Sequence, residues 1–394
     1  MATQPRPWLT RNLVVLSLVS LTQDAASELM YPLMPLFLTG VLAAPAIVLG
    51  AVEGFAELVA GLSKFYAGRA SDRIGRKTLI TTGYGFAAVG KVFVASAAAW
   101  PMVLFGRAVD RVGKGVRSAP RDAMITTSVD SEHFTKALGF HRSADTLGAV
   151  IGPIFALIGL SLLNNDVRAV MWWAVVPAIL SMLLTLFVKE SRKVSSGRAQ
   201  HVKVKLPLSF WKAALPLIAI SAINIPDTLL LLRLSQLGVS QTNVVLAYIA
   251  FNVVYTLSAY PAGVIASRLR PRSVYAIGML AFGITYFAIG QFRSPSVWLF
   301  VIVAMYGLFP ALTDGIGKSL IALSTPREVH GQAQGVFQSL AGGSILIAGL
   351  WAGAVWSFGS GHGSLPFTIA GILGITSAGY LYASNRRTTD YLPS

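Results

Sequence analysis

The feature that most constrains this chain is a succession of apolar segments separated by short polar links. Each segment is close to the length of about 20 residues that a helix needs to cross a bilayer. We count about twelve of them. They are centred near Leu21, Leu58, Ala88, Val109, Ile151, Val176, Ile223, Ile249, Leu280, Gly307, Leu346 and Ile372. Charge interrupts the fourth and fifth, so hydropathy alone is expected to undercount there. The chain is predicted to be an all-α integral membrane protein.

The basic residues predict the orientation of these spans. They fall in alternate links, at Arg6 and Arg11, Arg69 to Lys77, Lys136, Lys189 to Lys205, Arg268 to Arg272, Arg327, and Arg386 with Arg387. The opposite links hold only Arg168 and Arg293. Links rich in Lys and Arg stay on the cytoplasmic side. Both termini are therefore predicted to be cytoplasmic, which requires an even number of spans.

The sequence also predicts that the chain consists of two related halves. The longest polar stretch, Lys189 to Lys212, lies near the midpoint. It predicts a six-helix bundle over residues 1–188, a cytoplasmic linker over 189–210 and a second six-helix bundle over 211–394. Short patterns recur about 200 residues apart, as internal repeats do. Gly68-xxx-Asp72-Arg73 returns as Gly263-xxx-Ser267-Arg268, and Asp110-xx-Gly113-Lys114 returns as Asp314-xx-Gly317-Lys318.

Three segments resemble motifs of one transporter family. The charged stretch Gly68 to Lys77, between the second and third spans, is similar to the signature loop of the major facilitator superfamily. Arg111-Val112-Gly113-Lys114-Gly115 is similar to the motif of the fourth helix, with Lys114 in place of an amide. Gly148-xxx-Gly152-Pro153 resembles the fifth-helix motif associated with antiporters, although its trailing glycine pair is missing.

The resemblance implies twelve helices in two pseudo-symmetric six-helix bundles, with a substrate site between the bundles near the membrane midplane. It also implies alternating access and a monomeric carrier. A gating role would fall on Gly68, Asp72, Arg73, Gly75 and Arg76 of the signature loop, together with Arg121 of the fourth span. The antiporter-like residues would be Gly148, Gly152 and Pro153.

Two pairs of acids in apolar spans are the candidates for proton coupling. Asp24 and Glu28 lie four residues apart in the first span and share a helix face, and Glu53 and Glu57 repeat this spacing in the second. A charge in hydrocarbon is costly, and it persists where it faces a cavity or a partner. Paired carboxylates cannot both ionise easily, so one could bind and release a proton. The alternative is that these acids neutralise buried bases such as Lys64, Lys91 and Arg107 in fixed ion pairs.

The fourth span is unusually basic. Its residues Arg107, Asp110, Arg111 and Lys114 can share one helix face, and so can Arg117 and Arg121. One interpretation is a structural ion-pair network with the signature loop. The other is a fork for an anionic or zwitterionic group of a substrate.

Further charges interrupt other spans. Asp227 and Arg233 lie in the seventh span and Asp314 lies in the tenth, and these are also candidates for substrate binding or charge relay. His141, Arg142 and Asp145 fall within one turn of the fifth span, where a hydrogen-bonded structural histidine is expected. Tyr255, Tyr306 and Phe309 are expected to pack in the core rather than to stack on a substrate.

Composition excludes several other classes. The chain is 54% hydrophobic and only 12% charged, and its net charge of +16 is spread over short links, which argues against a nucleic-acid partner. It has no cysteine, no Walker loop and no histidine cluster. We therefore expect no cofactor, no metal site and no enzymatic activity.

The sequence predicts a secondary carrier of the bacterial inner membrane that moves a small organic solute by alternating access, with proton-coupled export as the preferred reading. Its partners would be the solute, protons and the lipid bilayer. Acids in the first two spans favour amphiphilic or cationic cargo. The basic fourth span favours an organic anion or a metal chelate. A membrane receptor or scaffold that does not transport is the remaining alternative.

Overall fold

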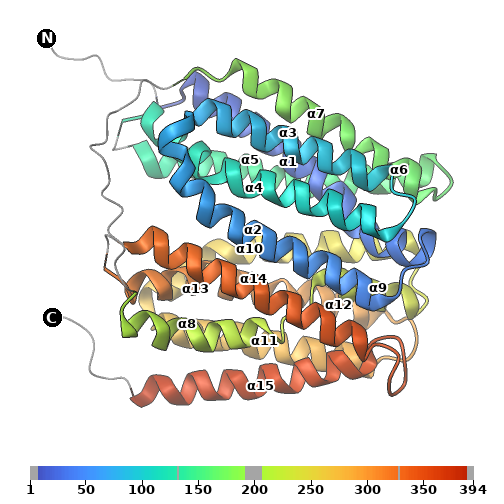
Figure 1. Cartoon of the computed structure of the whole chain (residues 1–394). Coiled ribbons are helices and arrows are strands. Elements are labelled where there is room, and N and C mark those ends of the chain that lie inside the picture. Colours follow the sequence, from blue (N-terminus) through green and yellow to red (C-terminus); the bar gives the residue numbers. More distant parts are fainter. Residues whose placement is uncertain (1–7, 131–132, 191–205, 327–328, 388–394) are drawn as a thin grey trace, which may run out of the picture. The chain divides into compact units, whose positions relative to one another are not determined.

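The computed structural model describes residues 8–130, 133–190, 206–326 and 329–387, without the side chains of 67–74, 135, 267 and 384–387. This part of the chain is helical and contains no β-strand (Figure 1). The N-terminal elements are α1 (Arg11–Met30), η1 (Tyr31–Leu33), η2 (Leu36–Val41), α2 (Ala46–Ile74), α3 (Arg76–Ala95), α4 (Trp100–Ser128), α5 (Phe134–Leu162), α6 (Val167–Trp173), α7 (Val175–Leu184) and η4 (Thr185–Phe187). The later elements are α8 (Leu208–Ser221), α9 (Asp227–Gln236), α10 (Gln241–Arg268), α11 (Pro271–Gln291), α12 (Val297–Tyr306), α13 (Leu308–Leu323), α14 (His330–Ala354) and α15 (Ser364–Arg387).

The helices confirm the predicted all-α membrane fold. Among the described residues, ten helical segments are long and apolar enough to cross a bilayer. The fourth span is absent from those ten although α4 is a continuous helix of 29 residues, because its charges lower its hydropathy. The seventh span is divided into α8 and α9, where Pro226 precedes the first residue of α9. Pro lacks the N–H that a continuing helix would need. When α4 and the divided seventh span are added to the ten, the described residues contain the predicted twelve spans.

The signature segment is not the ten-residue link that the sequence suggests. Helix α2 continues to Ile74 and α3 begins at Arg76, so Gly75 alone reverses the chain. Its φ of +89° lies in the left-handed region, which glycine adopts without a steric penalty. The structure describes only the backbone at Gly68, Asp72 and Arg73, whereas it describes Gly75 and Arg76 in full.

Two compact units make up the chain. Unit 1 comprises Met1–Leu33 and Val59–Lys205, and unit 2 comprises Met34–Leu58 and Leu206–Ser394, so the division falls inside α2. The limits expected for the two bundles, 1–188 and 211–394, stay a prediction, because residues 191–205 of the linker lie outside the described part of the chain.

In unit 1, α3 packs along α4, α1 packs along α5, and α7 lies against both α1 and α3. Glycines bring the backbones of α3 and α4 together. A methyl group on Gly90 would meet the Gly106 carbonyl oxygen at 2.5 Å, and one on Gly106 would meet that of Gly90 at 2.7 Å. Small residues at a helix interface permit this close approach, which supplies van der Waals contact where lipid gives no hydrophobic driving force.

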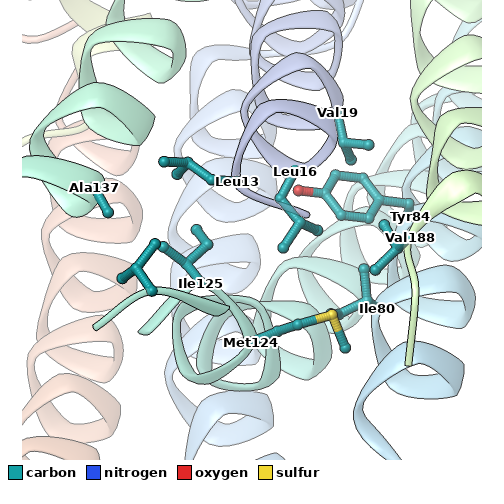
Figure 2. Close-up of a cluster of buried hydrophobic side chains, with 10 residues drawn as sticks. Leu13, Leu16, Val19, Ile80, Tyr84, Met124, Ile125, Ala137 and Val188 are labelled. Atoms are coloured by element: carbon teal, nitrogen blue, oxygen red, sulfur yellow. The ribbon is translucent and has the colours of Figure 1, made fainter. Parts of the chain in front are cut away.

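A cluster of buried apolar side chains joins four of these helices in unit 1 (Figure 2). It consists of Leu13, Leu16, Val19, Ile80, Tyr84, Met124, Ile125, Val129, Ala137 and Val188. Tyr84 is fully buried, yet its hydroxyl lies 3.2 Å from Ser20 Oγ. The apolar cluster therefore borders directly on a polar network and fixes one of its members.

In unit 2, α11 packs against α15 and α13, α14 packs against α8, and α10 packs against α12 and α13. The first part of α2 lies against α14 through facing glycines, since a methyl group on Gly50 or on Gly349 would collide with the backbone of the other. Aromatic rings pack together in its interior, where Phe282, Tyr286 and Tyr306 are buried and contact one another at tilted angles.

Candidate functional site

The contact between α1 and α5 is set by two glycines. A methyl group on Gly148 would collide with the Leu21 carbonyl oxygen and approach the Asp24 Cβ to 3.1 Å. One on Gly152 would meet the Ala25 carbonyl oxygen at 2.5 Å. The backbones therefore touch, and α5 continues through Pro153 without ending. The antiporter-like glycines thus hold α5 directly against the helix turn that carries Asp24.

This close approach brings two carboxyl groups together. The carboxyl group of Asp24 on α1 lies close enough to that of Asp145 on α5 for the two to interact. A carboxylate can only accept hydrogen bonds, so two carboxyl groups bond each other only when one of them holds a proton. Glu28, one turn along α1, and Lys114 of α4 both lie close enough to act electrostatically on Asp24. The arrangement is a pair of neighbouring carboxyl groups with a base beside it, and such a pair could hold one proton between its members.

Asp145 also faces two arginines. Its carboxylate lies 3.4 Å from Arg142 Nη1 and 3.9 Å from Arg121 Nη1. Arg121 donates at 2.9 Å to Ser20 Oγ on α1 and at 3.1 Å to Asp122. The Arg121 guanidinium therefore ties α4 to both helices that carry the carboxyl pair.

A buried histidine extends this network along α1. His141 Nδ1 lies 3.4 Å from Ser17 Oγ, and its Nε2 lies 3.4 Å from Ser20 Oγ. Both ring nitrogens thus face serine hydroxyls, which can donate or accept. This contact set is the hydrogen-bonded structural role that the sequence predicts for His141.

The bases of α4 are largely engaged inside unit 1. Asp110 accepts from Lys91 Nζ at 3.1 Å and lies 3.9 Å from Arg107 Nη1. The side chain of Lys91 is only 4% exposed, and those of Asp110 and Arg107 are each 7% exposed. Arg117 is buried, and its guanidinium carbon lies 4.3 Å above the centre of the Tyr84 ring. This network lies inside unit 1, and its partner from outside α4 is Lys91 of α3 and not a residue of the signature segment.

The other α4 candidates are placed differently. Arg111 is buried, whereas Lys114 is exposed on the side that reaches Asp24. Nearer the end of α4, Arg76 of the signature segment donates to the Ala123 carbonyl at 3.4 Å and to Thr127 Oγ1 at 3.3 Å. Two bases of this span therefore stand beside the carboxyl pair, Lys114 acting on Asp24 and Arg121 on Asp145.

In unit 2, Asp227 accepts from the Tyr306 hydroxyl at 2.9 Å. The Tyr286 hydroxyl lies 3.3 Å from that of Tyr306 and donates to the Ile225 carbonyl at 2.9 Å. Two buried tyrosines therefore hold the start of α9, and Phe309 packs beside them. This agrees with the core role expected for Tyr306 and Phe309.

Arg233 is a clamp between loops. It is 2% exposed and donates to the carbonyls of Phe292, His362 and Gly361 at 2.6, 2.8 and 3.4 Å. These bonds connect the end of α11 with the loop before α15 and give the buried guanidinium its acceptors. Asp314 is exposed on α13, where the Tyr255 hydroxyl lies 3.4 Å from it.

The second pair of acids belongs to unit 2. Glu53 is 3% exposed and Glu57 is half-buried on the first part of α2. A methyl group on Gly342 of α14 would meet the Glu57 carbonyl oxygen at 2.7 Å. The backbone around Glu57 is therefore fixed against α14.

Sequence reasoning missed Asp145 as the partner of Asp24. The signal was available, because Asp145 lies three residues before Gly148 and so shares its helix face. Within the described residues, no group of three His, Cys, Asp or Glu side chains could hold a metal ion.

Comparison with known proteins agrees with this architecture. The family model described as Major Facilitator Superfamily matches residues 16–229 and 217–393. An uncharacterized MFS-type transporter, MJ1317, of Methanocaldococcus jannaschii is 28% identical over 382 residues, which are 93% of this chain and 94% of the relative. The multidrug resistance protein MdtH of Yersinia enterocolitica is 23% identical over 378 residues, 92% of each chain.

Solved structures share the fold at low sequence identity. The nucleoside transporter NupG has a TM-score of 0.77 and 13% identity, over 96% of this chain and 100% of that one. A bacterial homologue of the human lysosomal transporter Spinster, in an inward-facing and unoccupied conformation, has a TM-score of 0.74 and 16% identity, over 99% and 100%.

Proposed function

The chain belongs to the major facilitator superfamily and is a multi-pass secondary transporter, and from this premise we propose that it exports a small organic solute in exchange for protons. The carrier would work as a monomer in a bacterial inner membrane, with both termini in the cytoplasm. The distribution of Lys and Arg over alternate links supports that orientation.

The observation that carries the proposal is the contact between the Asp24 and Asp145 carboxyl groups. With one proton shared, the pair holds a single negative charge, and α1 and α5 stay together. Loss of that proton leaves two anions in contact, which repel each other strongly away from bulk water. Lys114 and Arg121 would then be drawn toward the separating carboxylates. Proton binding could in this way bias the packing of α1 on α5, as a coupled conformational change requires.

Among the possible kinds of transport, the residues best support export of an amphiphilic or cationic solute. The acids Asp24, Glu28 and Asp145 gather at one place, whereas Lys91 and Arg107 of the basic network face Asp110. The relative named as a multidrug resistance protein is consistent with such cargo. Transport of an organic anion would have to rely mainly on Lys114.

The gating role of Gly68, Asp72 and Arg73 is a further part of the proposal. Arg76, one residue beyond Gly75, joins the signature segment to the end of α4 through Ala123 and Thr127. A change in α4 would thereby reach the turn at Gly75. Asp72→Asn should shift the balance of inward and outward states in accessibility labelling.

The test uses purified protein in liposomes with an imposed pH gradient and a pH-sensitive dye inside. Ethidium, a nucleoside and an organic acid are offered in turn. The proposal expects ethidium to drive proton movement opposite to its own in the wild-type chain and not in Asp24→Asn. Proton movement driven only by the organic acid, or none with any of the three, would contradict it.

A further inference from the structure

A small cavity opens in unit 2 near the ends of four helices. It has a volume of about 90 Å³, and it lies where α8 and α11 begin and where α13 and α15 approach their ends. Its nine lining residues include Lys212, Arg272, Tyr275 and Tyr380. None of the carboxyl candidates for proton coupling lines the cavity, although Asp314 lies close enough to Tyr275 to act on it electrostatically.

The lining is suited to an anion. Lys212 and Arg272 supply two positive charges, the tyrosines supply two hydroxyl donors, and this lining contains no acid. Tyr275 is largely buried, so one wall is fixed, whereas Lys212 is exposed at the rim. Arg presents a planar fork that matches the oxygens of a phosphate, and Lys adds a point charge.

The size of the cavity limits what can enter. Sites for drug-sized ligands measure about 300–1,000 Å³. The cavity, at about 90 Å³, lies below that range and has room for one compact oxyanion such as a phosphate group.

The surface beside the cavity is apolar. Leu208, Lys212 and Leu215 follow one another along one face of α8, and the two leucines are 68% and 56% exposed. Tyr380 of α15 is 63% exposed. In a membrane-spanning bundle, such a face is covered by acyl chains. A phosphate entering here would therefore carry hydrocarbon chains that lie against α8.

We propose that this cavity binds the phosphate headgroup of an anionic phospholipid from the cytoplasmic leaflet. Basic pockets between membrane helices on the cytoplasmic side are suited to such headgroups. The positive-inside pattern predicts the cytoplasmic side for this end of unit 2, which leads to the C-terminus. The bound lipid would brace α8 against α11 and α15, independently of proton coupling.

The test is native mass spectrometry of the purified full chain with added phosphatidylglycerol, phosphatidylcholine or inorganic phosphate. The proposal expects a phosphatidylglycerol adduct that phosphatidylcholine does not match and that excess inorganic phosphate weakens. Each base near a membrane surface contributes about 1 kcal/mol of attraction, a factor of about five. The double variant Lys212→Gln, Arg272→Gln should therefore bind phosphatidylglycerol about 25-fold more weakly.

Arg293→Gln is the matched control, because it removes an exposed base just after α11, at the other end of that helix. It should leave the adduct unchanged. Equal loss in Arg293→Gln and in the double variant would mean only a general effect of net charge and would overturn the site. Binding of inorganic phosphate without any preference for phosphatidylglycerol would also overturn the assignment to lipid. If the double variant folds poorly, Lys212→Gln alone should still show the loss of about fivefold.

Discussion

The two units stabilise their polar interiors by different means. Unit 1 uses ions, with Lys91, Arg107 and Asp110 buried together and the Asp24 and Asp145 carboxyl groups in contact. Unit 2 uses neutral groups around its charges: the hydroxyl of Tyr306 faces Asp227, and backbone carbonyls surround Arg233. Related halves can therefore be held together by unlike chemistry.

The sharpest contrast lies between two residues that the repeat relates. Asp110 of α4 is buried and paired with Lys91, whereas Asp314 of α13 is exposed and faces Tyr255. The pattern Asp-xx-Gly-Lys is the same in both places. Similar sequence thus preserves the helix but neither the role of the acid nor the close glycine contact, because a methyl group on Gly113 would collide with the Gly83 carbonyl oxygen whereas one on Gly317 would meet only the Tyr275 ring at 3.4 Å.

The largest expected effect comes from breaking the ion cluster of unit 1. Asp110→Asn leaves Lys91 and Arg107 buried without their carboxylate, and removal of one partner of a buried pair costs about 3–5 kcal/mol. Reversible unfolding in mixed micelles should show this loss. Asp314→Asn, the matched change in unit 2, should stay within about 0.5 kcal/mol. Equal losses at the two positions would remove the contrast between the units.

The next effect concerns the spacing of α1 and α5. Gly148→Ala places a methyl group against the Leu21 carbonyl, and overpacking of this kind costs about 1–3 kcal/mol. Gly139→Ala is the control, since nothing lies within 4 Å of a methyl group at that position in the same helix. Gly148→Ala should lower the Tm and weaken transport, and Gly139→Ala should do neither. A harmless Gly148→Ala would show that the helices need not touch there.

The smallest effect is expected in the neutral network of unit 2. Tyr306→Phe keeps the ring stack with Phe251 and Phe309 but removes the donor to Asp227. The net loss of such a hydrogen bond is about 1 kcal/mol. Tyr255→Phe removes a longer contact to exposed Asp314 and should cost less. A loss at Tyr306 as large as that at Asp110 would mean that unit 2 depends on charge as strongly as unit 1.

Sequence reasoning predicted the helices better than the contacts. The spacing of the segments, together with their hydropathy, was sufficient to predict the twelve spans. Spacing was needed for α4, because its charges lower its hydropathy. The single-residue turn at Gly75 was missed, because a charged stretch reads as a loop although its residues are compatible with a helix. The clamp made by Arg233 and the pairing of Lys91 with Asp110 depend on tertiary packing, which helical periodicity does not encode.

The central claim is that Asp24 and Asp145 share a proton. The infrared absorption of protonated carboxyl groups, recorded for the protein in lipid at neutral pH, tests it without any substrate. We expect a band that is lost in Asp24→Asn and in Asp145→Asn and kept in Asp227→Asn, whose carboxyl faces Tyr306. A spectrum in which neither Asp24→Asn nor Asp145→Asn removes intensity would contradict the shared proton and, with it, the coupling site.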